Sequence, residues 1–370
     1  MKEGITRQQS SAIQGTAILL MLWHHFFSDI QAYGNQLYFA WGEMVWRAAW
    51  FGKICVALFA FVSGYGMFHV LMRSREDSFF PRLLQDYGAV LRQLFSLYLK
   101  YWLVFLLLPG AELLAGVRTF DMEEFIGNFL GISSTYQQTW WYMWQYVKML
   151  MLLPFLELLF FTFPQQKEKK KKVLFFIILS TVAILLAVTG LVLYPPLWEW
   201  MLTVARNLRI SYFMPFCIGF LMARFSLYQR LAERLEKLGK PWNIGISVVA
   251  LCSVVAVRVA LSDSAAYAET DFLLVPIFVY ALLTLLLSLP YVERILIWFG
   301  KQSTYMWLTH VYICAYLGTW LAEHVRFGLL FYLILLALSA AAAALLNLLT
   351  RKLLTIKNRQ RYNDEKRKMR

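Results

Sequence analysis

The chain has 370 residues, of which 60% are hydrophobic and only 16% are charged. Soluble domains carry about 25% charged residues, so this composition, with a mean hydropathy of +0.54, excludes an ordinary soluble domain. Apolar runs of membrane-spanning length recur along the sequence, without the period-2 alternation of a transmembrane β-barrel. The sequence therefore predicts an all-α, polytopic membrane helical bundle.

The net charge of +14 does not indicate a nucleic-acid partner, because the basic residues cluster in short connections between apolar runs. Such placement sets membrane topology, and here it predicts a multi-pass protein of the cell membrane with both termini in the cytoplasm. We expect one integral-membrane domain over 1–350 and a basic cytoplasmic tail over 351–370. The ten predicted spans are 12–30, 51–72, 93–110, 139–162, 173–194, 210–226, 243–261, 272–290, 304–322 and 328–350.

The first span contains the stretch QGTAILLMLWHH (14–25), which ends in His24 and His25. If the helix starts near Ser11, a rise of ~1.5 Å per residue puts His25 about 20 Å along it. That depth is past the midplane of a hydrocarbon core about 30 Å thick. A titratable group is costly there and is by default a functional hypothesis. The alternative is an ordinary core histidine that faces the bundle and bonds a backbone carbonyl.

The connection 73–92 is amphipathic after Pro81, so we expect it to lie on the membrane surface. Arg92, where the third span begins, is either a cation for the phosphates of a cytoplasmic ligand or an ordinary positive-inside flank. Lys100 lies two helical turns further in. It therefore requires a partner, a water-filled cavity or room to snorkel.

Aromatic residues, among them Trp141 and Tyr142, mark the outer boundary of the fourth span after a long external loop (111–138). Interfacial anchoring accounts for such a belt, and aromatic faces also suit a glycan acceptor. In the second span, Gly64 and Gly66 allow close helix approach. Further along, Arg258 lies toward the outer end of the seventh span, where we expect it to snorkel.

The ninth span opens with FGKQSTYMWLTH (299–310), in which Gly300 and Ser303 predict a turn and a helix start. His310 then lies about two turns inside the membrane, on the cytoplasmic half. Two histidine-bearing helices in one bundle, with a basic cytoplasmic mouth, predict a catalytic chamber. The four cysteines do not have metal-ligand spacing, so we expect no metal.

Six stretches together carry a resemblance that covers nearly the whole chain. They are QGTAILLMLWHH (14–25), LFAFVSGYGMF (58–68), VLRQLFSLYLKYW (90–102), WWYMWQYVKMLMLLP (140–154), FMPFCIGFLMAR (213–224) and FGKQSTYMWLTHVYI (299–313). In order and spacing they resemble the integral-membrane acyltransferase family three, of the polysaccharide O-acetylase type. The resemblance implies a basic residue, ten intervening positions and an essential histidine, which is His25 here. Gln14 occupies the basic position, and Arg92 matches a family pair of arginines reduced to one.

The resemblance implies an O-acyltransferase that moves an acyl group, expected to be acetyl, from acyl-CoA to a hydroxyl of a cell-surface or lipid-linked glycan. Acyl-CoA is the donor substrate, no further cofactor is expected, and the other partners are the glycolipid acceptor and membrane lipid. We expect His25 and His310 to be catalytic. The substrate-binding candidates are Gln14, His24, Ser63, Tyr65, Arg92, Lys100, Trp141 and Tyr142.

Two other classes of function remain open at this stage. A membrane transporter of a glycan or lipid would also have many helices and a few buried polar groups. Such transporters often carry internal repeats, and none is visible in this sequence. A structural or sensory membrane protein would tolerate replacement of both His25 and His310.

Overall fold

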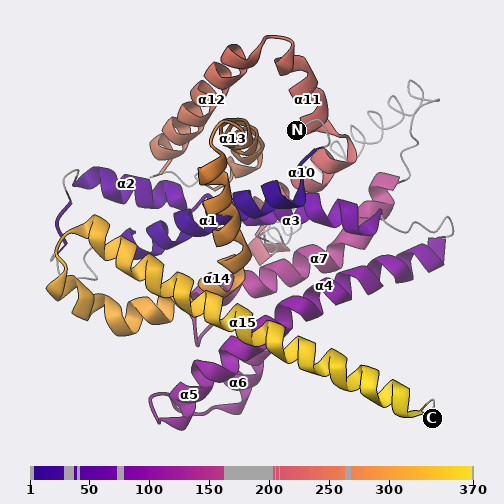
Figure 1. The fold of residues 1–370 in the computed structure, drawn as a ribbon, viewed down its shortest axis with the longest axis vertical. Coiled ribbons are helices and arrows are strands. Elements are labelled where there is room, and N and C mark those ends of the chain that lie inside the picture. The colour runs from indigo at the N-terminus through magenta and orange to yellow at the C-terminus, as the bar shows by residue number, and fades with distance from the viewer. Residues whose placement is uncertain are drawn as a thin grey trace, which may run out of the picture.

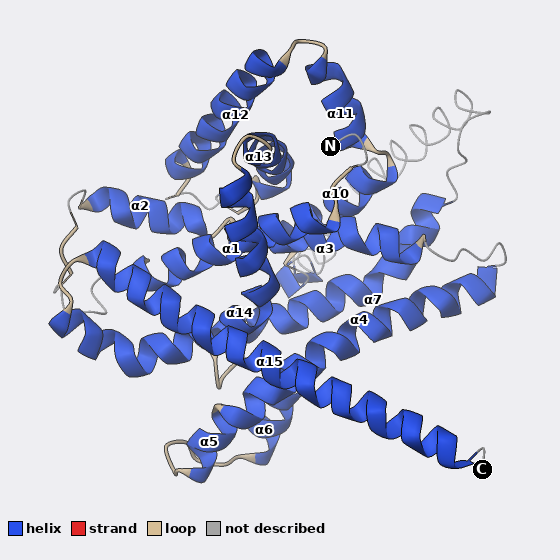
Figure 2. Cartoon of the chain, in the orientation of Figure 1, coloured by secondary structure: helices blue, strands red, loops and turns tan. Residues whose placement is uncertain are grey.

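The computed structural model describes residues 4–28, 37–39, 42–72, 79–161, 203–204, 206–207, 209–262 and 268–368. Figure 2 shows that this part of the chain is built from helices and connecting loops. Its β-structure is limited to an isolated bridge between Tyr38 and Phe327. The predicted span 173–194 lies outside the described residues.

Each of the other predicted spans corresponds to a helix. The elements are α1 (Arg7–Phe27), α2 (Glu43–Gly52), α3 (Cys55–Leu71), α4 (Phe79–Leu107), α5 (Pro109–Leu114), α6 (Met122–Phe129), η2 (Gln138–Trp140), α7 (Trp141–Phe161), α10 (Ile210–Arg224), α11 (Leu227–Glu236), α12 (Lys240–Ala260), α13 (Asp271–Leu286), α14 (Pro290–His324) and α15 (Gly328–Lys368). Within the described residues, four helices are long and apolar enough to cross a membrane, or five if α10 and α11, bent by 66°, form one span. The helical membrane bundle is thus confirmed, whereas the count of ten spans stays a prediction.

Helix α1 lies in the middle of the bundle, between α14, α2 and α3 (Figure 1). It begins at Arg7, four residues earlier than predicted, because Thr6 and Gln9 form a capping box that satisfies two backbone N–H groups. Its buried face is made of small and branched apolar residues. They include Ala12, Ile13, Ala17, Ile18 and Leu22.

Helices α1 and α14 cross through a reciprocal pair of glycines. A Cβ added to Gly15 would lie 1.9 Å from the carbonyl oxygen of Leu296, and one added to Gly300 would lie 1.8 Å from that of Ser11. Only hydrogen fits between backbones this close. The helix start predicted at Gly300 and Ser303 is therefore wrong, since α14 runs unbroken from Pro290 and Gly300 serves as a packing position.

Helices α3 and α10 cross in the same way. A Cβ on Gly64 would lie 1.9 Å from the Phe216 carbonyl oxygen, and one on Gly219 would lie 2.1 Å from that of Phe61. The close approach predicted from Gly64 is thus observed. Gly66 differs, because no atom lies within 4 Å of the position of its Cβ.

Helix α4 begins at Phe79, so residues 79–92 of the predicted connection are continuous with the predicted third span, and their placement on the membrane surface stays a prediction. In the first turn of α4, Arg82 is buried and pairs with the buried carboxylate of Glu157 on α7. The two helices lie side by side in Figure 1. Sequence inspection could not find this pair, because its members are 75 positions apart.

A second buried ion pair joins α12 to α13. Arg258 is fully buried and pairs with Asp271, while its Nε donates to the carbonyl oxygen of Phe51 over 3.5 Å. The prediction that Arg258 snorkels to the surface is therefore wrong. An opposite charge inside the protein removes the need to reach water.

The predicted external loop 111–138 contains most of α5 and all of α6, which Figure 1 shows at one end of α4. Asn128 anchors this region: its Nδ2 donates to Glu124 and Thr135, and its Oδ1 accepts from the N–H of Tyr136. At the other end of the chain, α15 continues past residue 350 to Lys368, so no break in the helix marks the predicted start of the tail.

Candidate active site

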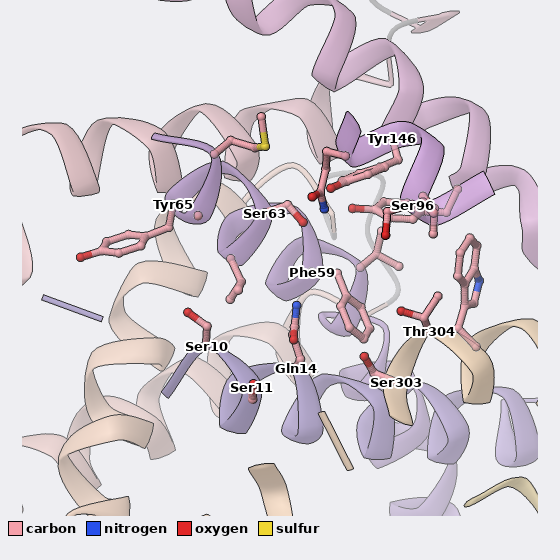
Figure 3. A pocket seen from close by; sticks show the side chains of 18 of the residues that line it. Ser10, Ser11, Gln14, Phe59, Ser63, Tyr65, Ser96, Tyr146, Ser303 and Thr304 are labelled. Atoms are coloured by element: carbon pink, nitrogen blue, oxygen red, sulfur yellow. The ribbon is translucent and has the colours of Figure 1, made fainter. Parts of the chain in front are cut away.

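A cavity of about 750 Å³ lies between α1, α3, α4, α14 and the start of α7 (Figure 3). Pockets that bind small molecules and cofactors have volumes of about 300–1,000 Å³. Seven of the residues predicted from the sequence line it. They are Gln14, His25, Ser63, Tyr65, Lys100, Trp141 and Tyr142.

The α1–α14 crossing explains why His25 and His310 meet. His25 lies ten residues after Gly15, and His310 lies ten residues after Gly300. Because the helices run in the same direction from this crossing, both histidines are about 15 Å beyond it. Their ring centroids are 5.1 Å apart. Two histidines 285 positions apart in the sequence thus form one pair inside the bundle.

The tautomer of His310 follows from its neighbours. Its Nδ1 lies 3.0 Å from the carbonyl oxygen of Met306 and 2.9 Å from that of Trp307. Carbonyl oxygens only accept hydrogen bonds, so Nδ1 carries the proton and Nε2 keeps a lone pair. The ring is fully buried, and Nε2 has no hydrogen-bond partner among the described residues.

His24 points to the other side of α1. Its Nδ1 donates to the carbonyl oxygen of Ala49 on α2 over 2.8 Å, and its ring contacts that of Trp50 at 5.7 Å. His24 does not line the cavity, although its ring centroid is 5.0 Å from that of His25. The backbone-bonded core histidine considered in the sequence analysis therefore describes His24, and the ring that faces the cavity is that of His25.

Polar side chains from several helices converge in the middle of the cavity. In Figure 3 the amide of Gln14 points from α1 toward Ser63 on α3, and Ser303 and Thr304 extend from α14. Lys100 is the one residue on the lining face of α4 that the sequence analysis named as a site residue. The lining residues of α4 are Gln93, Ser96, Leu97 and Lys100. Their spacing of three and four places them on one helix face, a pattern that is visible in the sequence.

One end of the cavity lies beside the first residues of α1, where Arg7 is exposed at the surface. Ile5 and Arg7 line this mouth, and the N–H of Ile5 donates to the hydroxyl of Tyr65 over 2.9 Å. The lining residues that the structure describes include Arg7 and Lys100 but no carboxylate. The cavity is therefore suited to an anionic ligand. Arg92 is exposed and is not part of the lining, so its assignment to a phosphate site stays a prediction.

The other end of the cavity is walled by aromatic residues. Two indoles hold α14 against η2: Trp140 Nε1 donates to the Leu308 carbonyl oxygen over 3.2 Å, and Trp307 Nε1 donates to that of Thr139 over 3.1 Å. We call this reciprocal contact the tryptophan clasp. Next to it, Trp141 lines the cavity while the guanidinium of Arg209 lies 4.2 Å from its ring centroid.

The described part of the chain contains no group of three or more histidine, cysteine or carboxylate side chains that could hold a metal ion. A family model described as an acyltransferase domain matches residues 9–348. This match includes every predicted site residue and the helices that carry them. No curated protein matches the chain, and no solved structure does.

Proposed function

Because the chain belongs to this family, acyltransferase family three, and is a membrane acyltransferase, we propose that it acylates a glycan. The acyl group, acetyl in our proposal, moves from acyl-CoA to a hydroxyl of a cell-surface or lipid-linked glycan at the cell membrane. The family match bears out the resemblance seen in the sequence. It also favours an enzyme over the transporter considered there.

One observation carries the proposal: the ring of His25 lines the same cavity as Arg7, at the opposite end of α1. Their separation of 18 positions corresponds to about 27 Å of helix. An acyl-CoA whose phosphates lie near Arg7 can extend its pantetheine arm along α1, so that the thioester reaches His25. The acyl group then needs no separate carrier to approach the far side of the membrane.

His25 acts as the general base in this proposal. It takes the proton of the acceptor hydroxyl while the hydroxyl oxygen attacks the thioester carbonyl carbon. Such help is worth about 10²–10⁴-fold in rate. The Nε2 lone pair of His310 is available to accept a hydrogen bond from one nitrogen of His25, leaving the other free for the proton transfer, as a second group orients the base in catalytic triads.

The remaining lining residues have binding roles in the proposal. Trp141 and Tyr142 give the sugar an aromatic surface near the tryptophan clasp. Gln14 and Ser63 offer hydrogen bonds to the pantetheine amides. Gln14 does not supply the charge that a basic residue would, so charge recognition falls to the other lining residues.

The test compares surface glycans by mass spectrometry in cells with and without the gene, and in cells with single variants. We expect His25→Ala to remove the acyl mass increment. His324→Ala is the matched control, because His324 is exposed at the end of α14 and its Nδ1 bonds the Trp320 carbonyl oxygen, away from the cavity. Unchanged acylation in His25→Ala, at equal protein levels, would reject the proposed function.

A further inference from the structure

Lys100 is a cation inside the cavity that the proposed chemistry has not yet used. It lies near the end of α4, and its Nζ is 5.9 Å from the ring centroid of Tyr305 on α14. Among the described residues no carboxylate forms an ion pair with it. An ammonium group within a membrane span is costly, and here the protein supplies only an aromatic face. This arrangement indicates that the anionic partner of Lys100 is part of the ligand.

The position of Lys100 along the cavity indicates which part of the ligand it meets. Tyr305 precedes His310 by five residues, so the two lie about 7.5 Å apart along α14. Lys100 therefore lies on the side of the histidine pair that faces the mouth at Arg7. The phosphates of a donor would be held much further away, at the mouth itself.

The reacting atoms can be placed on the same axis. An acceptor oxygen in hydrogen-bond reach of His25 is about 2.6–3.2 Å from the ring nitrogen. The thioester carbon is then about 3–3.5 Å beyond that oxygen. The carbon is thus about 6 Å from His25, and the sulfur, one bond further toward the mouth, is at the level of Lys100.

We propose that Lys100 is the catalytic residue that receives the leaving group, its ammonium pairing with the sulfur of CoA as the thioester breaks. This step rests on the proposed acyl transfer. The acceptor oxygen forms a C–O bond to the acyl carbon, and its proton passes to His25. The C–S bond breaks, and its electron pair goes to sulfur. The thiolate pairs with Lys100, takes up the proton that His25 accepted and leaves as free CoA, and His25 returns to its neutral form.

The experiment measures binding of CoA and of desulfo-CoA, which lacks only the sulfur, to the purified full chain in lipid nanodiscs. Both ligands are titrated into wild type, Lys100→Met and Lys100→Arg, at one pH below and one pH above the pKa of the CoA thiol. Size-exclusion profiles and thermal unfolding establish that each variant is folded. If Lys100→Met does not fold, Lys100→Gln takes its place.

We expect the wild type to prefer CoA over desulfo-CoA at the higher pH. In Lys100→Met, the ratio of the Kd of desulfo-CoA to the Kd of CoA should fall by roughly 10- to 100-fold. This is the range expected when one hydrogen bond to a charged group is lost. Lys100→Arg should keep most of it, and desulfo-CoA should bind all three proteins equally. His25, Arg7 and His69 also line the cavity, and they are unchanged in every variant.

Other results would overturn the assignment. Equal weakening of CoA and desulfo-CoA in a folded Lys100→Met variant would place Lys100 at a phosphate. Unchanged binding of both ligands would remove it from the donor site. A wild type that binds neither ligand would instead contradict the proposed function, so the two proposals fail in distinguishable ways.

Discussion

The α1–α14 crossing and the α3–α10 crossing are both built on a reciprocal pair of glycines, but they position different kinds of side chain. In each, two glycines let the backbones approach until a carbonyl oxygen occupies the place of a Cβ. Beyond the α3–α10 crossing the helices present apolar rings, such as Phe68 against Phe220 at 5.5 Å. Beyond the α1–α14 crossing they present His25 and His310. Close packing therefore supports stability in both places, and in one it also sets the geometry of a titratable pair.

The largest expected effect comes from removing His25, the proposed base beyond the α1–α14 crossing. His25→Ala should lower acyl transfer by about 10²–10⁴-fold, because proton transfer to the ring is lost. The rate of radiolabelled acetyl transfer by purified protein measures this. A matching loss in His324→Ala would show that the assay responds to any histidine change in α14 or α1, and would undo the distinction between the two crossings.

The next effect tests whether close packing positions the histidines. Gly300→Ala puts a methyl group 1.8 Å from the Ser11 carbonyl oxygen, so α14 must move. A displacement of about 1 Å at a catalytic group costs roughly 10²-fold. Gly219→Ala at the α3–α10 crossing should lower the rate of acyl transfer by less than about tenfold, because that crossing does not carry the histidines.

Gly245→Ala on α12 is the control for both glycine variants, because no atom lies within 4 Å of its Cβ position. We expect wild-type activity from it. Equal losses of activity in Gly300→Ala and Gly219→Ala would mean that neither crossing has a special relation to the histidine pair.

A smaller effect is expected when the partner of His25 is changed. His310→Phe keeps a ring but removes the Nε2 lone pair, so His25 loses its orienting acceptor. One hydrogen bond is worth about 0.5–1.5 kcal/mol, which corresponds to a decrease of about 2- to 12-fold in kcat. The pH profile of kcat should shift as well. A variant with lower yield but an unchanged profile would indicate a packing role for His310 alone.

The smallest expected effect is a change in stability, and it concerns two glycines within α3. Gly64→Ala overlaps the Phe216 carbonyl oxygen, and overpacking of this kind costs about 1–3 kcal/mol of the free energy of unfolding. The added methyl group of Gly66→Ala, two residues further along, meets open space. This variant should not change the free energy of unfolding measurably. Thermal unfolding of the two variants in the same detergent makes the comparison, and equal midpoints would contradict the packing seen at Gly64.

The sequence is sufficient to predict the helices and the histidine pair for a physical reason. Long apolar runs, and a titratable residue within such a run, are local features of the sequence. The polar face of α4, with Gln93, Ser96 and Lys100, is equally visible as a spacing of three and four, although only Lys100 was singled out.

The errors concern partners that are distant in the sequence. Gly300 and Ser303 are as typical of a helix start as of a helix crossing, and only the presence of Ser11 across the gap decides between the two. Arg258 reads as a snorkelling residue until Asp271 is found beside it. A local pattern does not contain the information that selects between such alternatives.

The tryptophan clasp has a practical consequence for following the protein in solution. Trp307 lines the cavity, and its backbone carbonyl lies 2.9 Å from Nδ1 of His310, so its indole belongs to the wall on which a ligand would rest. Indole emission depends on the polarity around the ring. The fluorescence difference between wild type and Trp307→Phe is thus a built-in optical signal for occupancy, with no label attached to donor or acceptor.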